Sequence, residues 1–95
     1  MSTLTTREIE ERLKTVPDWT LVEGQAIEKC FTFGSFKEAI SFVVRIAFHA
    51  EEVDHHPDIT ISYKTVTLRY RTHSEGGLTE KDFASAQKAN RVSWV

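Results

Sequence analysis

The chain has 95 residues and a mass of 10.9 kDa, which suits one domain and leaves no room for two independent cores. Its 12 Lys and Arg residues against 14 Asp and Glu residues give a formal net charge of -2, which argues against a nucleic-acid backbone binder. No apolar stretch reaches the roughly 18 residues of a membrane span, and the polar segment 1–11 does not resemble a signal peptide. The single cysteine, Cys30, is interpreted as a small buried residue and favours a reducing compartment. We therefore expect one cytoplasmic domain spanning residues 1–95.

The N-terminal third predicts a helix followed by two strands. Thr5 and Glu8 have the spacing of a capping box, so we expect a helix to begin after Thr5. Pro17 should end it, because proline lacks an N–H group and disfavours helical geometry in the residue before it. Alternating apolar residues then predict two short strands near residues 19–23 and 26–33.

The remaining sequence predicts a long helix, a hairpin and a last helix. Ser35 and Glu38 repeat the capping-box spacing, and an apolar stripe continues this helix to about Ala50. Residues 58–71 alternate with period two and predict a β-hairpin, after which Thr79 begins a helix that runs almost to the end of the chain. The order is αββαββα. Because the strands alternate on one side, we expect an α+β fold, a four-stranded antiparallel sheet with the helices packed on one face.

The second hairpin should bring histidines together beyond the ends of its strands. If Tyr63 pairs with Val66, all apolar side chains of the hairpin share one face and His56 lies level with His73. The other pairs in this register are Ile61 with Leu68 and Ile59 with Tyr70. A register shifted by two residues matches the same faces and stays open, because Lys-Thr is not a preferred two-residue turn. His56 and His73 are close together in either register.

Acidic residues crowd the carboxyl end of the long helix, next to the histidines. Glu51, Glu52 and Asp54 lie where the helix dipole presents partial negative charge, so that acids there are mildly destabilising. Local rules are broken in this way most often at functional sites. The proline that follows His56 biases this residue toward an extended conformation, so the rings of His55 and His56 should project in different directions.

The segment Glu51-Glu52-Val53-Asp54-His55-His56-Pro57 begins a pattern that resembles the signature of the pterin-4a-carbinolamine dehydratase family. The pattern continues with Tyr63, Thr72-His73, Gly76-Gly77-Leu78-Thr79 and Asp82. The resemblance extends in coarse form from the first helix to the last. It implies a homo-oligomer that dehydrates 4a-hydroxytetrahydrobiopterin to quinonoid dihydropterin and water, in the recycling of tetrahydrobiopterin. It also implies that no metal and no cofactor takes part.

The same resemblance implies the roles of the site residues. Imidazole has a pKa of about 6.5 and can give or take a proton at neutral pH, which suits the loss of hydroxide from the pterin 4a carbon. The implied catalytic residues are the acid–base pair His55 and His73, the pterin-positioning residue His56 and the orienting carboxylate Glu51. The implied substrate-binding residues are Asp54, Thr72, Asp82 and Trp19. Two of these have a plain structural alternative, because Asp82 fits a helix cap and Trp19 fits a core or a partner surface.

Other interpretations stay open. The histidines could be ordinary solvated loop residues, or ligands of a transition metal, for which imidazole and carboxylate are common donors. Members of the family also serve as dimerisation or assembly factors, so the chain could bind a protein partner without catalysis. A dimer or tetramer is expected from the resemblance, yet the last helix offers few large apolar side chains for it beyond Val92 and Trp94.

Overall fold

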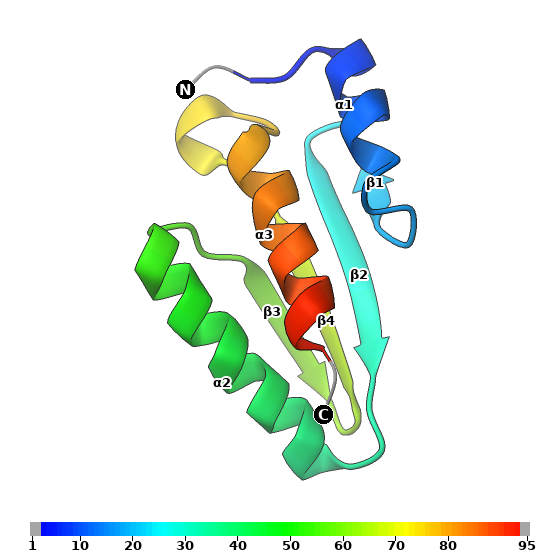
Figure 1. Cartoon of the computed structure of the whole chain (residues 1–95), viewed down its shortest axis with the longest axis vertical. Helices are drawn as coiled ribbons and strands as arrows, with labels where there is room; N and C mark the ends of the chain where they lie inside the picture. The colour runs from blue at the N-terminus through cyan, green and yellow to red at the C-terminus, as the bar shows by residue number, and fades with distance from the viewer. Residues whose placement is uncertain (1–2, 94–95) are drawn as a thin grey trace.

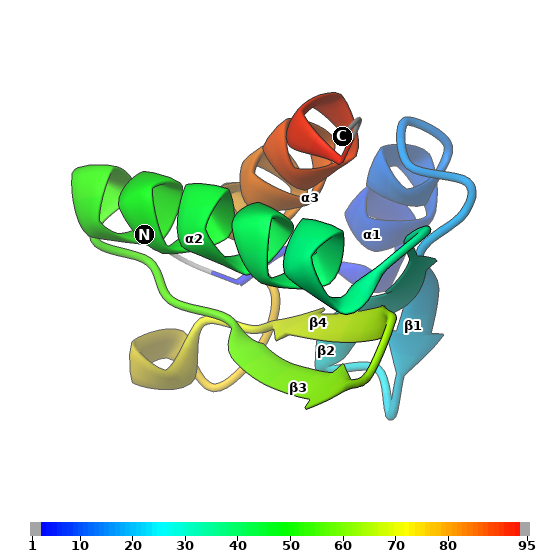
Figure 2. The ribbon, with the colours of Figure 1, turned by 90° about the horizontal axis from the view of Figure 1, so that it is seen from below.

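The computed structural model describes residues 3–93, and within them three α-helices cover one face of a four-stranded antiparallel sheet (Figures 1 and 2). The elements are α1 (Thr6–Leu13), β1 (Thr20–Val22), β2 (Ala26–Thr32), α2 (Phe36–Val53), β3 (Asp58–Ser62), β4 (Thr65–Tyr70), the short 3-10 helix η1 (His73–Glu75) and α3 (Glu80–Val92). The strands lie in the order β1-β2-β4-β3. The predicted fold class is confirmed. None of these helices is long and apolar enough to cross a membrane.

The helices begin where the capping residues predict. Glu8 N donates to Thr5 Oγ1 at 3.1 Å, and Thr5 N donates to Glu8 Oε1 at 2.8 Å, which completes the expected capping box of α1. Ser35 caps α2. This helix continues to Val53, past the expected end near Ala50, and it therefore carries acidic residues in its last turn.

The register of β3 against β4 differs by two residues from the register we expected. Ile59 lies opposite Leu68, whereas the expected register placed it opposite the last residue of β4. Both registers place the same apolar side chains on one face of the hairpin, so alternation alone could not separate them. The turn decides between them, because Tyr63 adopts a left-handed φ of 51° and closes a tight connection without glycine. The prediction that His56 lies level with His73 is therefore wrong.

The core fills the space between the helices and the covered face of the sheet. Its buried side chains include Ile27, Phe31, Val66, Leu68 and Tyr70 from the sheet, Phe42 and Ile46 from α2, and Phe83, Ala86 and Ala89 from α3. Cys30 is exposed and not buried as predicted, because it alternates with Phe31 and so lies on the uncovered face. Trp94, which we considered for an oligomer contact, lies outside the described residues.

Candidate functional site

The predicted residues His55, Thr72 and Asp82 come together between the end of α2 and the start of α3. The backbone reverses at Asp54, which ends α2 with a left-handed φ of 51°. The next amide, His55 N, donates to Ala50 O at 3.0 Å. This reversal turns the His55 side chain into the protein, where the residue is only 8% exposed.

Asp82 is the centre of this cluster. Its carboxylate is fully buried, and Oδ1 lies 2.7 Å from His55 Nε2. Oδ2 accepts hydrogen bonds from Thr72 Oγ1 at 2.8 Å and from Thr79 N at 2.9 Å. Because an ionised carboxylate only accepts, His55 Nε2 is the donor in this pair, and the neutral ring then presents Nδ1 as its acceptor. Asp82 therefore caps α3 and holds His55 at the same time.

The loop before α3 is closed by main-chain hydrogen bonds that place His73 beside this cluster. Thr72 N donates to Gly77 O at 3.0 Å, and Gly77 N donates to Thr72 O at 3.4 Å. Gly76 supports the turn with a φ of 72°, which glycine adopts without strain. His73 begins η1 directly after Thr72, so its backbone is anchored one residue away from the side chain that binds Asp82, while its own side chain is exposed.

His56 and Glu51 form a second, exposed pair. His56 Nε2 lies 2.5 Å from Glu51 Oε2, and the two side chains are 53% and 77% exposed. An exposed ion pair of this kind contributes little to stability. The pair is nevertheless placed where an incoming molecule can reach both groups. Asp54, between them in sequence, is also exposed.

Trp19 lies in the core, separated from His55 by the ring of Tyr70. Trp19 is 4% exposed, and its indole Nε1 donates to Asn90 Oδ1 at 3.0 Å. Its ring centroid is 5.9 Å from that of Tyr70, which in turn is 5.9 Å from that of His55. Sequence patterns treat Tyr70 as an ordinary strand residue, because alternation reports only the face on which a side chain lies.

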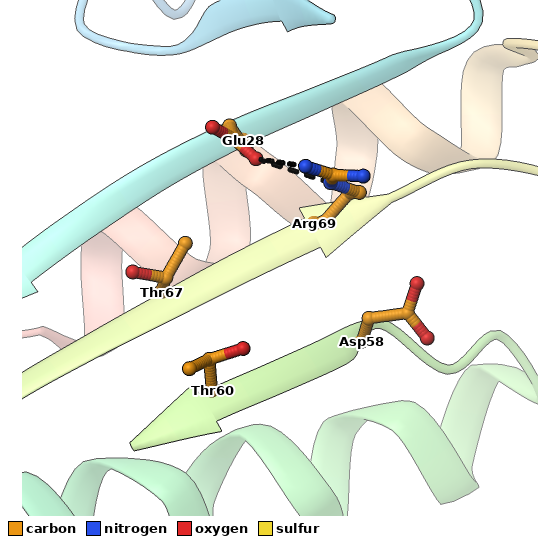
Figure 3. Close-up of a pocket in the computed structure, with 5 residues that line it drawn as sticks. All are labelled: Glu28, Asp58, Thr60, Thr67 and Arg69. Carbon is orange, nitrogen blue, oxygen red and sulfur yellow. Dashed lines mark hydrogen bonds and ion pairs between the residues drawn. The ribbon is translucent and has the colours of Figure 1, made fainter. Parts of the chain in front are cut away.

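A cavity lies elsewhere, on the uncovered face of the sheet (Figure 3). It has a volume of about 300 Å³ and is lined by Glu28, Asp58, Thr60, Thr67 and Arg69, none of which is a predicted site residue. Arg69 Nε and Nη2 donate to Glu28 Oε1 at 3.0 and 2.9 Å across the two strands. Charged and hydroxyl side chains at this spacing are typical of the solvated face of an antiparallel sheet.

His49 is a fourth histidine and lies outside the predicted site, between α2 and α3. Burial lowers the pKa of His49, and the positive charges of Lys88 and Arg91 lower it further against the opposing charge of Glu52. Within residues 3–93 its Nε2 is buried and has no hydrogen-bond partner. Protonation therefore costs more in the folded chain than in the unfolded chain.

This lowered pKa predicts a loss of stability at acidic pH. The unfolded imidazole has its ordinary pKa of 6.5, so below that pH the unfolded chain binds more protons than the folded chain. The His49 contribution to the free energy of unfolding is complete above pH 6.5 and is lost as the pH falls toward the lower folded value. Urea unfolding at pH 7.5 and 5.5 should show a smaller decrease for His49→Gln than for the parent protein. Equal decreases in both proteins would contradict this account.

Comparisons with known proteins identify the family of the chain. A family model described as pterin 4 alpha carbinolamine dehydratase matches residues 2–92. A protein of Mycobacteroides abscessus, provisionally named a pterin-4-alpha-carbinolamine dehydratase, is 49% identical over 87 residues, which are 92% of each chain.

Two solved structures share the fold. A transcriptional coactivator/pterin dehydratase from Brucella melitensis superposes with a TM-score of 0.93 at 37% identity, over 98% of this chain and 100% of that one. A pterin dehydratase-like protein, described as a RuBisCO assembly factor in the alpha-carboxysome, has a TM-score of 0.70 at 23% identity, over 80% and 89% of the two chains. On the matches to the family model and to these relatives, the chain belongs to the pterin-4a-carbinolamine dehydratase family.

Proposed function

We propose that this protein is a hydro-lyase that dehydrates 4a-hydroxytetrahydrobiopterin to quinonoid dihydropterin and water, in the recycling of tetrahydrobiopterin. The observation that carries the proposal is the pair of His55 and Asp82, in which a buried carboxylate holds an imidazole at 2.7 Å. This is how a protein fixes the orientation and the tautomer of an acid–base histidine.

The reaction needs two proton transfers at neighbouring atoms. The bond between carbon 4a and its hydroxyl oxygen breaks as that oxygen receives a proton. The adjacent nitrogen loses a proton, a carbon–nitrogen double bond forms, and water leaves. We assign the two transfers to His55, through Nδ1, and to His73, because an imidazole can serve as either acid or base near neutral pH. His56 then positions the pterin, and Glu51 holds His56 through their 2.5 Å contact.

Of the four residues proposed for substrate binding, one is exposed and can contact the pterin, and three are buried and would act through other residues. Asp54 is exposed and can contact the pterin directly. Thr72 and Asp82 are buried and already bonded to each other, so we propose that they act by holding His55 and the loop of His73. Trp19 is buried too, and we propose that it acts through Tyr70.

An absorbance assay of 4a-carbinolamine breakdown, with and without a chelator, tests the proposed function. The protein should accelerate the loss of the carbinolamine above the rate in buffer, and the chelator should not change the rate. Within residues 3–93 no three His, Cys, Asp or Glu side chains are grouped in a way that could hold a metal ion. Loss of activity with the chelator, restored by added zinc, would replace the proposal with a metal mechanism.

We also propose that the protein acts as a homo-oligomer, and that α2 makes the contact. Val44, Ala47, Phe48 and Glu51 line a groove of about 200 Å³ on the outer side of this helix, which we call the α2 groove. Residues at this spacing form the four-residue hole that receives a side chain from a facing helix. Phe48 is 73% exposed and Val44 is 47% exposed, which is unusual for apolar side chains on a long helix. A second copy of α2, related by two-fold symmetry, would supply a matching Phe48.

The substitution Phe48→Glu tests this contact. A carboxylate buried between two helices loses its hydration, so association should weaken by more than about tenfold and the variant should elute as a monomer. Light scattering at several concentrations measures the mass. Leu21→Glu, at a 38% exposed position on β1, is the matched control and should keep the parent mass. A monomeric parent protein, or an oligomeric Phe48→Glu variant, would contradict the proposal.

A second candidate function is the binding of a protein partner. The exposed α2 groove favours it, because a helix from another protein could fill the same hole. The related Brucella protein is described as a coactivator as well as a dehydratase, and the structural neighbour as an assembly factor. A parent protein that forms no oligomer and has no dehydratase activity would favour this candidate. For either function we propose a cytoplasmic location, in line with the free thiol of Cys30.

A further inference from the structure

Tyr70 contacts both the core residue Trp19 and the ring of His55. Tyr70 is the last residue of β4 and is fully buried. Its ring plane makes an angle of 19° with the His55 ring, at a centroid distance of 5.9 Å. The Trp19 ring also contacts Tyr70, at a centroid distance of 5.9 Å and an angle of 43°. The near-parallel pair of Tyr70 and His55 has the geometry of offset aromatic stacking.

The hydrogen bond to Asp82 does not by itself fix the plane of the His55 ring. That bond holds one atom, Nε2, at 2.7 Å from Asp82 Oδ1. The torsion that turns an imidazole about its own bond has a broad energy minimum, so a ring held at one atom can still rotate. Rotation would move Nδ1, the atom left free to exchange a proton. A second contact on the face of the ring is needed to define the direction in which Nδ1 points.

We propose that Tyr70 is a positioning residue for His55. The Tyr70 ring sets the plane of the imidazole, and Asp82 sets the tautomer of the imidazole. The inference rests on the proposed function for its kinetic consequence, but not for its structural one. Trp19 packs against Tyr70, and the Trp19 indole is held by its hydrogen bond to Asn90.

The hydroxyl group of Tyr70 takes no part in this role. Within residues 3–93 the Tyr70 oxygen is buried and has no hydrogen-bond partner. Burial raises the pKa of Tyr70, and the charge of Asp82 raises it further, so the phenol stays neutral throughout the physiological range. A neutral group of such high pKa is a poor proton donor or acceptor at pH 7. The contribution therefore comes from the aromatic face, which phenylalanine can replace.

Two substitutions at Tyr70 distinguish the contribution of its aromatic face from that of its hydroxyl group. Tyr70→Leu keeps an apolar core residue but removes the stacking surface, and it should lower kcat about fivefold to tenfold with KM unchanged within about twofold. Tyr70→Phe should keep the parent kcat. Phe31→Leu is the matched control, because Phe31 packs against Trp19 at a centroid distance of 5.9 Å, whereas the ring contact of His55 is with Tyr70. It should destabilise the fold in the same way and leave kcat unchanged.

A spectroscopic measurement tests the positioning without any substrate. The ring nitrogen resonances of His55, followed by NMR through a pH titration, should shift or broaden in Tyr70→Leu and match the parent in Tyr70→Phe and Phe31→Leu. If the parent protein does not dehydrate the pterin but this pattern is found, the proposed function fails and the positioning inference stands. Parent-like His55 resonances in Tyr70→Leu would overturn it. Equal changes in Tyr70→Phe or in Phe31→Leu would overturn it as well.

Discussion

Replacing His55 or His73 with alanine should lower kcat for pterin dehydration by about 10²- to 10⁴-fold, the usual contribution of one proton-transfer group. The His55 ring is held by Asp82, and the backbone of His73 follows Thr72 in a loop closed by main-chain hydrogen bonds. The rate should not fall to zero, because the other imidazole and the bound geometry remain. The absorbance assay at saturating and at low substrate measures both kcat and kcat/KM.

His49→Ala is the matched control for these substitutions. It removes a histidine of the same chain whose Nε2 has no hydrogen-bond partner within residues 3–93 and which interacts with His55 only as the weakest of its electrostatic neighbours, so it should lower kcat far less than either substitution. His73→Ala is the cleaner of the two tests, since its side chain is exposed and its loss should leave the fold intact. Either variant, folded and with parent rates at both substrate levels, would remove that histidine from the mechanism.

Replacing Asp82 with alanine should lower the free energy of unfolding by about 2 to 6 kcal/mol, because two buried donors lose their acceptor at a cost of about 1 to 3 kcal/mol each. The substitution leaves Thr79 N and His55 Nε2 without their acceptor, while Thr72 Oγ1 keeps its hydrogen bond with Thr79 Oγ1 at 2.8 Å. Each unsatisfied buried donor is costly. Since domains of this size are stable by only about 5 to 15 kcal/mol, Asp82→Ala should be close to unfolding. Urea unfolding at pH 7.5 measures the loss.

Glu8→Ala is the matched control, because Glu8 occupies the corresponding position of the capping box in α1 but is solvated. It should cost only a small part of the loss seen for Asp82→Ala. Asp82→Asn provides a folded comparison, since its amide oxygen still accepts one hydrogen bond. Equal losses for the Glu8 and Asp82 substitutions would mean that Asp82 is a helix cap and nothing more.

Local sequence signals were sufficient for the fold. Each helix begins at a side chain that satisfies free amides within its first turn, so Thr5, Ser35 and Thr79 could be located without tertiary information. Alternation identified the buried face of β2 and β4 for the same reason, because it depends on neighbours two residues apart, whereas all five residues of β3 are exposed. The signature from Glu51 to Asp82 indicated which residues to compare, and the structure brings His55, Thr72 and Asp82 of that set into contact.

Contacts between distant segments could not be predicted in the same way. The register of β3 and β4 depends on the left-handed conformation of Tyr63, and two registers satisfy the same pattern. The pair of His55 and Asp82 joins residues on either side of an intervening hairpin, and no spacing rule connects them. The stacking of Tyr70 on His55 depends on the exact path of the chain after Asp54. The exposure of Phe48 is likewise a property of how α2 packs, although its apolar stripe is visible in the sequence.

The carboxylate of Asp82 also ties catalytic competence to the first turn of α3. Fraying of a helix end ordinarily requires little free energy and does not change the structure of the rest of the protein. Here the fraying of that turn would carry away the acceptor that holds His55, far along the chain at the end of α2. Warming or mild denaturant should therefore release His55 from Asp82, and so lower the proposed activity, through a local opening that leaves the sheet and its core intact.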